Sequence, residues 1–96
     1  MADRKPSQIC IITVTGADKV GIVARLATVM AKANVNIVDI NQKIMEDYFV
    51  ITMAVDIGRA ELDIGQIRKR LDQVGKQMAL KITIQDENIF KAMHRV

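Results

Sequence analysis

The chain has 96 residues, of which 50% are apolar and 26% are charged, and a chain of this length buries one undivided apolar core, so a single domain over residues 1–96 is expected. Its 14 basic and 11 acidic residues leave a formal charge of +3 that is spread along the chain, which gives no indication of nucleic-acid binding. The single cysteine excludes an intrachain disulfide and a zinc site of the CxxC type, and because the sequence shows neither a bilayer-length apolar run nor a signal-peptide core, we expect a cytoplasmic protein.

The first segment, residues 8–15, is predicted to be a strand because apolar and β-branched residues occupy both its odd and its even positions. A strand of this kind is covered on both faces and lies inside a sheet. Gly16 to Lys19 interrupt the run. A helix that ends at Asn34 is then expected, because apolar residues recur at helical spacing at Val23, Leu26, Ala27, Met30 and Ala33.

The next two segments predict an edge strand followed by a second interior strand. Residues 36–45 alternate, with the polar side chains Asp39, Asn41 and Lys43 on the face opposite to Val38, Ile40 and Ile44. One solvated face fits the edge of a sheet. After a short turn at 46–47, residues 48–55 are apolar at both parities, which indicates another interior strand.

A second helix is predicted to begin after Asp63, which stands three residues before Gln66 as in a capping box. Its apolar stripe consists of Ile64, Ile67, Leu71, Val74 and Met78, and the helix is expected to stop near Gly75. Residues 80–84 alternate as a last strand. We expect residues 1–7 to be an N-terminal extension and residues 86–96 to form a short tail helix that Asp86 caps.

The resulting order, β-α-β-β-α-β with a tail helix, is that of the ferredoxin-like α+β sandwich. In this fold the first and third strands are interior and the second and fourth are edges, which agrees with the parity of each segment. Both helices pack on one face of the sheet, so apolar residues on the other face of the interior strands are left open. The tail helix or a second copy of the chain can cover that face, and we expect a homodimer.

The segment from Thr15 to Ala24 is the most informative one for function, because it joins an interior strand to a helix through two glycines and an aspartate. Backbone N–H groups and the positive end of the helix dipole attract anions there, and Gly21 lets a ligand such as a carboxylate approach the backbone. A simpler interpretation stays open, in which Gly16 and Gly21 permit the turn and Asp18 caps the helix.

Two blocks of sequence resemble the ACT domains, which are small ligand-binding modules usually attached to enzymes of amino-acid metabolism. The helix-entry block reads Gly16-x-Asp18-Lys19-x-Gly21-Ile22-Val23-Ala24, and the second-strand block reads Asn34-x-Asn36-Ile37-x-Asp39-Ile40-x-Gln42. The chain is most similar to the uncharacterised prokaryotic proteins made of a single ACT domain, which share the hairpin Asp47-Tyr48-Phe49 and a tail like Ile89-Phe90-x-Ala92-Met93.

This resemblance implies a regulatory homodimer that binds an amino acid or a similar small molecule near the helix-entry loop, often at the subunit interface. Carried over by position, the ligand-binding residues are Gly16, Asp18, Gly21, Ile22, Val23, Asn36 and Asp39. The backbone amides of Gly21, Ile22 and Val23 would receive the ligand carboxylate, and Asp18, Asn36 or Asp39 would receive its ammonium group or side chain. Asn36 and Asp39 are equally well explained as exposed residues of an edge strand.

Other functions of the same fold class find less support. RNA-recognition domains stack bases on aromatic side chains of the interior strands, whereas Tyr48 and Phe49 are adjacent and therefore on opposite faces. Metal-chaperone domains need two cysteines in the first loop, and acylphosphatase-like enzymes need an arginine there; both are missing.

The remaining polar features are assigned no chemistry. The cation run Arg68-Lys69-Arg70 fits the solvated face of a helix. His94 is the only histidine, so neither a metal cluster nor a nucleophile with a histidine base can be built within one chain, and we predict a non-enzyme without metal or cofactor. A protein-interaction module without a ligand stays open as the alternative to ligand binding.

Overall fold

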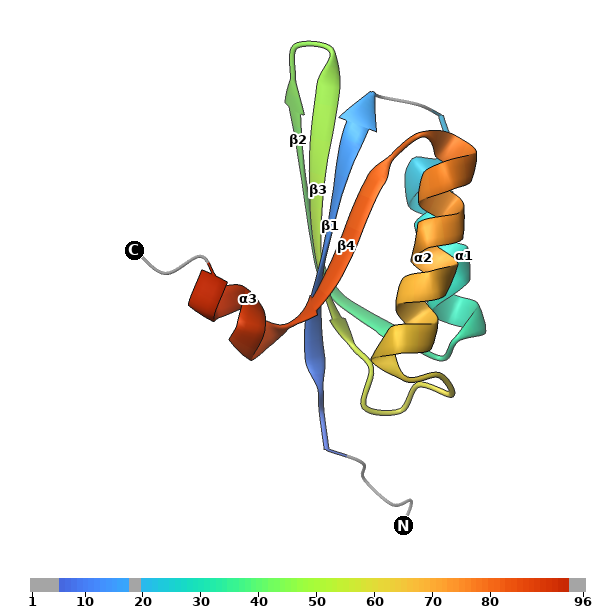
Figure 1. Cartoon of the computed structure of the whole chain (residues 1–96), viewed down its shortest axis with the longest axis vertical. Helices are drawn as coiled ribbons and strands as arrows, with labels where there is room; N and C mark the ends of the chain where they lie inside the picture. Colours follow the sequence, from blue (N-terminus) through green and yellow to red (C-terminus); the bar gives the residue numbers. More distant parts are fainter. Residues whose placement is uncertain (1–5, 18–19, 94–96) are drawn as a thin grey trace.

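Seven elements follow one another along residues 6–17 and 20–93, the parts of the chain that the computed structural model describes. The predicted β-α-β-β-α-β order with a tail helix is confirmed (Figure 1). The elements are β1 (Ile9–Ala17), α1 (Ile22–Lys32), β2 (Asn36–Met45), β3 (Tyr48–Asp56), α2 (Ile64–Met78), β4 (Lys81–Asp86) and α3 (Glu87–Met93).

The four strands form one antiparallel sheet in the order β2-β3-β1-β4. This order confirms that the first and third strands are interior and that the second and fourth are edges. Figure 1 shows α1 and α2 side by side on one face of the sheet, and α3 on the opposite face. The sheet therefore has a covered face and an open face, and α3 is the one element of the described residues that packs on the open face.

The core lies between the covered face and the two helices. Alternate residues of the interior strands point into it, from Cys10 to Val14 in β1 and from Phe49 to Val55 in β3, and all of them are almost fully buried. Ile67, Leu71 and Val74 of α2 close the core from the helix side. Met30 and Met53 are buried among them and pack in the core.

The start of α1 corrects the predicted apolar stripe. Ile22 is buried with Leu26 and Met30, whereas Val23, which the sequence pattern placed on the core stripe, is 43% exposed. At 100° per residue, positions 22 and 23 both lie within about 60° of a stripe through Leu26 and Met30, so helical periodicity alone does not decide which of the two is buried.

The end of α2 corrects a second prediction. Gly75 does not stop the helix, which continues to Met78 and closes at Ala79 in the left-handed conformation, with the Leu80 N–H donating to the Gly75 carbonyl at 2.8 Å. A Cβ on Gly75 would meet the Leu80 carbonyl oxygen at 2.8 Å. The glycine is therefore a point of close packing between α2 and the chain that enters β4.

Strand β2 is more exposed than the alternation predicted. A bulge between Ile37 and Asp39 breaks its pairing with β3, and only Ile37 is half-buried. Ile40 and Ile44 pair with core residues of β3 but remain 42% and 66% exposed. The reason is visible in Figure 1, where the β2–β3 hairpin extends beyond the ends of both helices, which leaves this part of its covered face bare.

Candidate functional site

The entry to α1 offers an open stretch of backbone. Gly21 is the N-cap residue with φ +87°, a left-handed conformation that favours glycine, and a Cβ built there meets no atom within 4 Å. The Ile22 side chain turns into the core, whereas Val23 stays partly exposed. The first N–H groups of a helix have no acceptor within it, and at the start of α1 these include the amides of Ile22 and Val23. Asp18 lies outside the described residues.

Gly16 belongs to β1 rather than to the loop, because the strand continues through Ala17, two residues beyond the predicted end. It pairs with Phe49 of β3. A Cβ at this position would lie 2.6 Å from Cδ2 of Leu80. Gly16 therefore makes room for the chain that enters β4, which favours the packing interpretation for this glycine.

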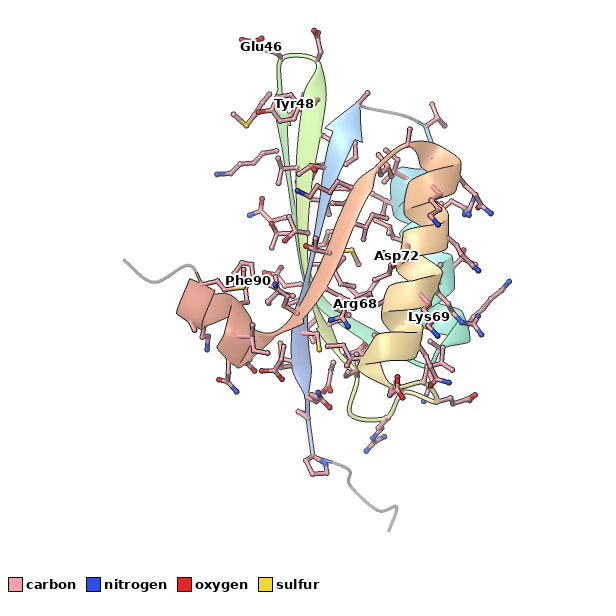
Figure 2. The ribbon with its side chains drawn as sticks, viewed as in Figure 1. Glu46, Tyr48, Arg68, Lys69, Asp72 and Phe90 are labelled. Carbon is pink, nitrogen blue, oxygen red and sulfur yellow. The ribbon has the colours of Figure 1, made fainter. Side chains whose placement is uncertain are left out.

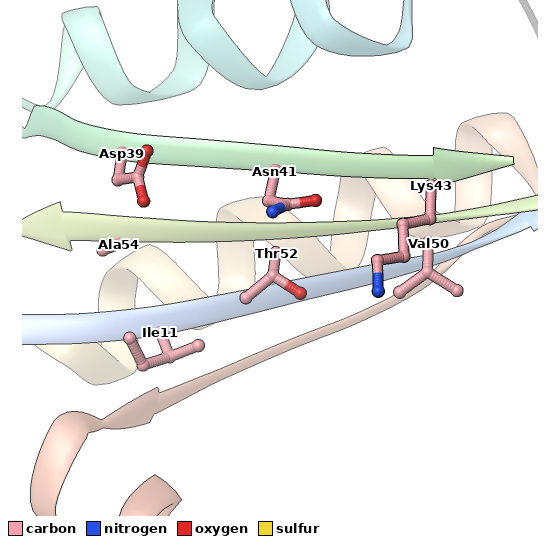
Figure 3. Close-up of a pocket in the computed structure, with 7 residues that line it drawn as sticks. All are labelled: Ile11, Asp39, Asn41, Lys43, Val50, Thr52 and Ala54. Carbon is pink, nitrogen blue, oxygen red and sulfur yellow. The ribbon is translucent and has the colours of Figure 1, made fainter.

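Asp39 lies on β2, on the open face of the sheet. It lines a shallow hollow of about 520 Å³ together with Asn41 and Lys43 of the same strand and with residues of β1 and β3. Figure 3 shows these three side chains on the same side of the sheet as Thr52 and Ile11. The Asp39 carboxylate accepts a hydrogen bond from the backbone N–H of Ile40 at 2.9 Å, which offsets part of its negative charge. Asn36 begins the same strand and is exposed.

Within one chain, the predicted residues fall into two separate groups. Gly16 shares a cross-strand row with Phe49 and Ile44, whereas Asp39 shares a row with Ala54 and Ile11. The two rows are five residues apart on β1, or roughly 17 Å at 3.3–3.4 Å per residue. The helix-entry amides and the polar residues of β2 therefore cannot hold one small ligand within a single subunit.

The open face carries rows of polar groups that the sequence analysis did not select. One row runs across all four strands as Thr83, Thr13, Thr52 and Asn41, and the next as Lys81, Thr15, Val50 and Lys43. The expected apolar character of this face is limited to a few residues such as Ile11 and Val50. In the sequence, this polar face could have been recognised from the threonines at alternate positions of both interior strands, Thr13 and Thr15 in β1 and Thr52 in β3. That they form rows across the sheet follows only from the strand order.

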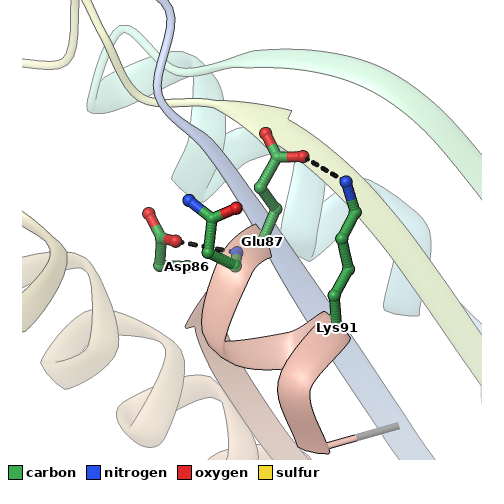
Figure 4. Close-up of polar contacts among 4 residues, drawn as sticks. Asp86, Glu87 and Lys91 are labelled. Atoms are coloured by element: carbon green, nitrogen blue, oxygen red, sulfur yellow. Dashed lines mark hydrogen bonds and ion pairs between the residues drawn. The ribbon is translucent and has the colours of Figure 1, made fainter. Parts of the chain in front are cut away.

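Helix α3 covers one end of the open face. Its start is capped as predicted, since the Asn88 N–H donates to Oδ1 of Asp86 at 2.8 Å, and Glu87 pairs with Lys91 at 3.1 Å (Figure 4). The half-buried Phe90 lies on the sheet side of the helix (Figure 2). Together with Met93 and the threonines of β1 and β4 it lines a cleft of about 260 Å³.

Among the described residues, two titratable groups have shifted pKa values, and both groups have a structural role. Burial in the core raises the pKa of the Cys10 thiol to about 11, and the neighbouring Asp86 carboxylate adds to the effect. The N–H groups of Gly58 and Gln8, which donate to Asp56 at 2.9 and 3.0 Å, lower the pKa of that carboxyl group. Cys10 is thus a poor nucleophile, and Asp56 ties the end of β3 to the chain before β1.

Residues 6–17 and 20–93 contain no candidate metal site. No three His, Cys, Asp or Glu side chains gather there as metal ligands. No helix of that part is long and apolar enough to cross a membrane.

Arg68 of the predicted cation run donates to the Ile84 carbonyl at 3.0 Å and so anchors α2 to β4. His94 lies outside the described residues.

Comparison with known proteins identifies the family to which this chain belongs. A family model described as the ACT domain matches residues 8–85. The chain belongs to the ACT domain family. The similar UPF0237 protein of Methanococcus maripaludis is 48% identical over 86 residues, covering 90% of this chain and 96% of the other. A UPF0237 protein of Pyrobaculum aerophilum is 42% identical over 89 residues, covering 93% and 99%.

Among solved structures, an ACT domain protein from Streptococcus pneumoniae matches this ACT domain with a TM-score of 0.77. It is 34% identical, and the match covers 90% of this chain and 97% of the other. The resemblance predicted from the helix-entry and second-strand blocks is therefore confirmed. As an ACT domain, the chain is a regulatory ligand-binding module.

Proposed function

We propose that this ACT domain is a regulatory homodimer that binds an amino acid at its subunit interface and catalyses no reaction. The observation that carries the proposal is the pair of half-sites in one chain. The open amides that follow Gly21 lie at one end of the sheet, and the polar residues Asn36 and Asp39 lie toward the other. A second subunit supplies what the first lacks.

The exposed strand β2 offers a self-complementary edge for that second subunit. Its outer edge is unpaired, and nearly all of its side chains are exposed. Antiparallel pairing of two copies about a two-fold axis through Asn41 places Asp39 opposite Lys43 of the partner subunit, twice. Opposite charges face each other at both positions, and the two sheets become one sheet of eight strands.

The same pairing brings the two groups of residues closer together. Lys43 shares its cross-strand row with Val50 and Thr15, and Thr15 directly precedes Gly16. Asp39 of the partner subunit therefore moves into this row, three strands from Thr15, or roughly 14 Å at 4.7–4.9 Å per strand. An amino acid with a long side chain spans this distance: the amides of Gly21, Ile22 and Val23 donate to its carboxylate, and the partner's Asp39 or Asn36 accepts from its side chain.

Thermal melting with each of the twenty amino acids tests the ligand. An amino acid present at 100 times its dissociation constant adds about 2.7 kcal/mol to the free energy of unfolding. Gly21→Asp places a carboxylate where the ligand carboxylate binds and removes this response. Gly21→Asn is the matched control, because asparagine tolerates a positive φ equally well but carries no charge. A response that survives Gly21→Asp excludes this site.

Sedimentation velocity of charge variants tests the dimer. Asp39→Lys and Lys43→Asp each place like charges opposite one another across the proposed β2 interface, and each is expected to dissociate the dimer. The double variant restores opposite charges with their positions exchanged and is expected to dimerise again. A dimer that survives both single variants has its interface elsewhere.

A protein-interaction module that binds no ligand is the second candidate, and the exposed apolar side chains of α3 favour it. Ile89 and Met93, one turn apart, are 55% and 62% exposed. Absence of a melting shift with every amino acid, together with a stable dimer, would support this candidate.

RNA binding is less favoured, because Phe49 is buried and Tyr48 lies at the tip of the hairpin. We place the protein in the cytoplasm, where a free buried thiol such as Cys10 is common.

A further inference from the structure

A groove of about 190 Å³ runs between α1 and α2 on the outer surface of the helix layer. Each helix contributes residues spaced by three, four and seven positions, which is one face of a helix. The floor is Val29 and Val74, and the walls are Arg25, Thr28, Lys32, Arg70, Gln73 and Gln77. Three of these wall residues are cations, and none of the lining residues is acidic.

The register of the two helices brings two of these cations face to face. The helices run in opposite directions (Figure 1), and one Nη2 hydrogen bond from Arg25 to Oε1 of Gln77 fixes which residues lie opposite each other. Because the helices are antiparallel, seven residues forward from Arg25 on α1 and seven residues back from Gln77 on α2 lead in the same direction along the groove, to Lys32 and Arg70. These two like charges therefore oppose each other across the groove, which is unfavourable for the empty protein.

No acidic partner of these two cations is present in the described residues. The ion pair recorded there, between Lys91 and Glu87, lies on α3 on the opposite face of the sheet. Lys32 lies in the last turn of α1, where carbonyl groups offset part of its charge, but Arg70 lies in the middle of α2. An oxyanion between the two side chains would convert their repulsion into two charge-assisted contacts.

We propose that this groove binds a small ligand that carries a linear polyphosphate group. Arg25 and Lys32 are seven residues apart, about 10.5 Å along the helix axis at 1.5 Å per residue, so the positive charge extends along the groove. Guanidinium and ammonium groups are the usual protein contacts for phosphate oxygens. An elongated anion contacts both ends of the groove, whereas a single phosphate contacts one. The site is separate from the proposed amino-acid site and does not depend on it.

Single-stranded nucleic acid also carries linear phosphate, but the groove lacks the second feature of such sites. Base stacking requires aromatic side chains, and the three aromatic residues of the chain, Tyr48, Phe49 and Phe90, lie on β3 and α3. The floor of two valines is too small to replace them. We therefore infer a small polyphosphate ligand rather than a strand of nucleic acid.

Thermal melting and calorimetric titration of the full chain with tripolyphosphate test the site, with sodium chloride at matched ionic strength as the reference. We expect the melting temperature to rise with tripolyphosphate, and orthophosphate to bind at least tenfold more weakly. Lys32→Gln and Arg70→Gln should each weaken tripolyphosphate binding at least tenfold. Lys69→Gln removes the same charge from the neighbouring position, which does not line the groove, and should leave the affinity within twofold.

A second readout separates a binding role from a packing role. Because Lys32 and Arg70 repel each other in the empty groove, either glutamine variant should melt no lower than the original chain in chloride. A lower melting temperature without loss of tripolyphosphate affinity would assign these residues to packing and overturn the proposal. Equal loss of affinity in Lys69→Gln, no effect of tripolyphosphate beyond that of chloride, or binding only of a single-stranded oligonucleotide would also overturn it. The response to amino acids, measured on the same variants, is expected to be unchanged.

Discussion

The two long helices begin in opposite ways. At the start of α2, Oδ1 of Asp63 accepts the N–H of Gln66 at 2.8 Å, and Oε1 of Gln66 accepts the N–H of Asp63 at 3.0 Å. At the start of α1, the N-cap residue is Gly21, which has no side chain to offer. The described residues thus cap the start of α2 with side chains, whereas the N-cap residue of α1 contributes no side-chain hydrogen bond. The proposed ligand site lies at the helix start that lacks such a cap.

The open start of α1 is held by packing instead of capping. Ile22 is 4% exposed and anchors the first turn to the core next to Leu26. Packing of this side chain can therefore hold the first turn without a side-chain cap from Gly21. The buried Ile22 side chain and the exposed Val23 side chain are neighbours in sequence but point in different directions.

The largest loss of stability is expected when the anchoring side chain of Ile22 is removed. Ile22→Ala removes a buried side chain and should lower the free energy of unfolding by about 3 kcal/mol. Val23→Ala is the matched control one residue away and should cost only about 0.5 kcal/mol, because Val23 is substantially exposed. Urea denaturation of both variants measures the difference. Equal losses would mean that the two side chains share the burial and that the anchor is misassigned.

A smaller loss of stability is expected when the N-cap side chain of α2 is removed. Asp63→Ala removes the acceptor for the Gln66 N–H and should cost about 1 kcal/mol in urea denaturation. Asp63→Asn retains an oxygen acceptor at the same position and is expected to cost less. The response to amino acids should be the same in both variants, since the capping box lies at the end of the helix layer remote from Gly21. A changed ligand response would link the two helix starts.

A comparable loss is expected at Gly21, but for a different reason. Gly21→Ala should cost about 1 kcal/mol because alanine is disfavoured at φ +87°, although a Cβ there meets no neighbour. Gly21→Asn tolerates this conformation better and should recover part of the loss. Thermal denaturation without ligand distinguishes them. Equal stability of the alanine variant and the original chain would mean that the backbone relaxes, and the loop geometry would then not be specific to glycine.

An effect of similar size, which depends on pH, is expected at Asp56, whose side chain accepts hydrogen bonds from two backbone amides. The Asp56 carboxylate accepts from Gly58 and Gln8, and these bonds lower its pKa in the folded protein below the ordinary 3.8. Its stabilisation is therefore complete above pH 3.8 and is lost as the pH falls through the lower, folded-state value. Asp56→Asn should be less stable by about 1 kcal/mol at pH 7, with the difference shrinking below pH 3.8. A difference independent of pH would exclude the carboxylate as its source.

Local patterns in the sequence were sufficient for most of the fold. The capping box at Asp63, the two interior strands and the exposed edge over 36–45 were predicted because each depends on neighbouring residues and on parity alone. The same patterns misplaced Val23 in the core and ended α2 at Gly75. Those two outcomes depend on how α1 meets the sheet and on how closely Leu80 passes behind α2.

The candidate site shows the same division. The open helix entry at Gly21 was predicted from the spacing of glycines between a strand and a helix, and the resemblance to ACT domains supplied Asn36 and Asp39. Their separation across the sheet was not predictable, since it results from the register of β2 on β3 and from the bulge beside Asp39. The groove between α1 and α2 was not predicted either, because its two walls are far apart in the sequence.

By itself, the sequence determined the order of the elements, the interior and edge strands, the family, and the presence of one helix start without a capping side chain of its own at Gly21. These follow from periodicity, turn residues and capping residues, which act over a few neighbouring positions. Only the tertiary structure decided that Ile22 rather than Val23 is buried, that Asp39 lies far from Gly21 within one chain, and that Lys32 faces Arg70. Such relations are set by strand register and helix packing, which bring together residues whose separation in sequence carries no local signal.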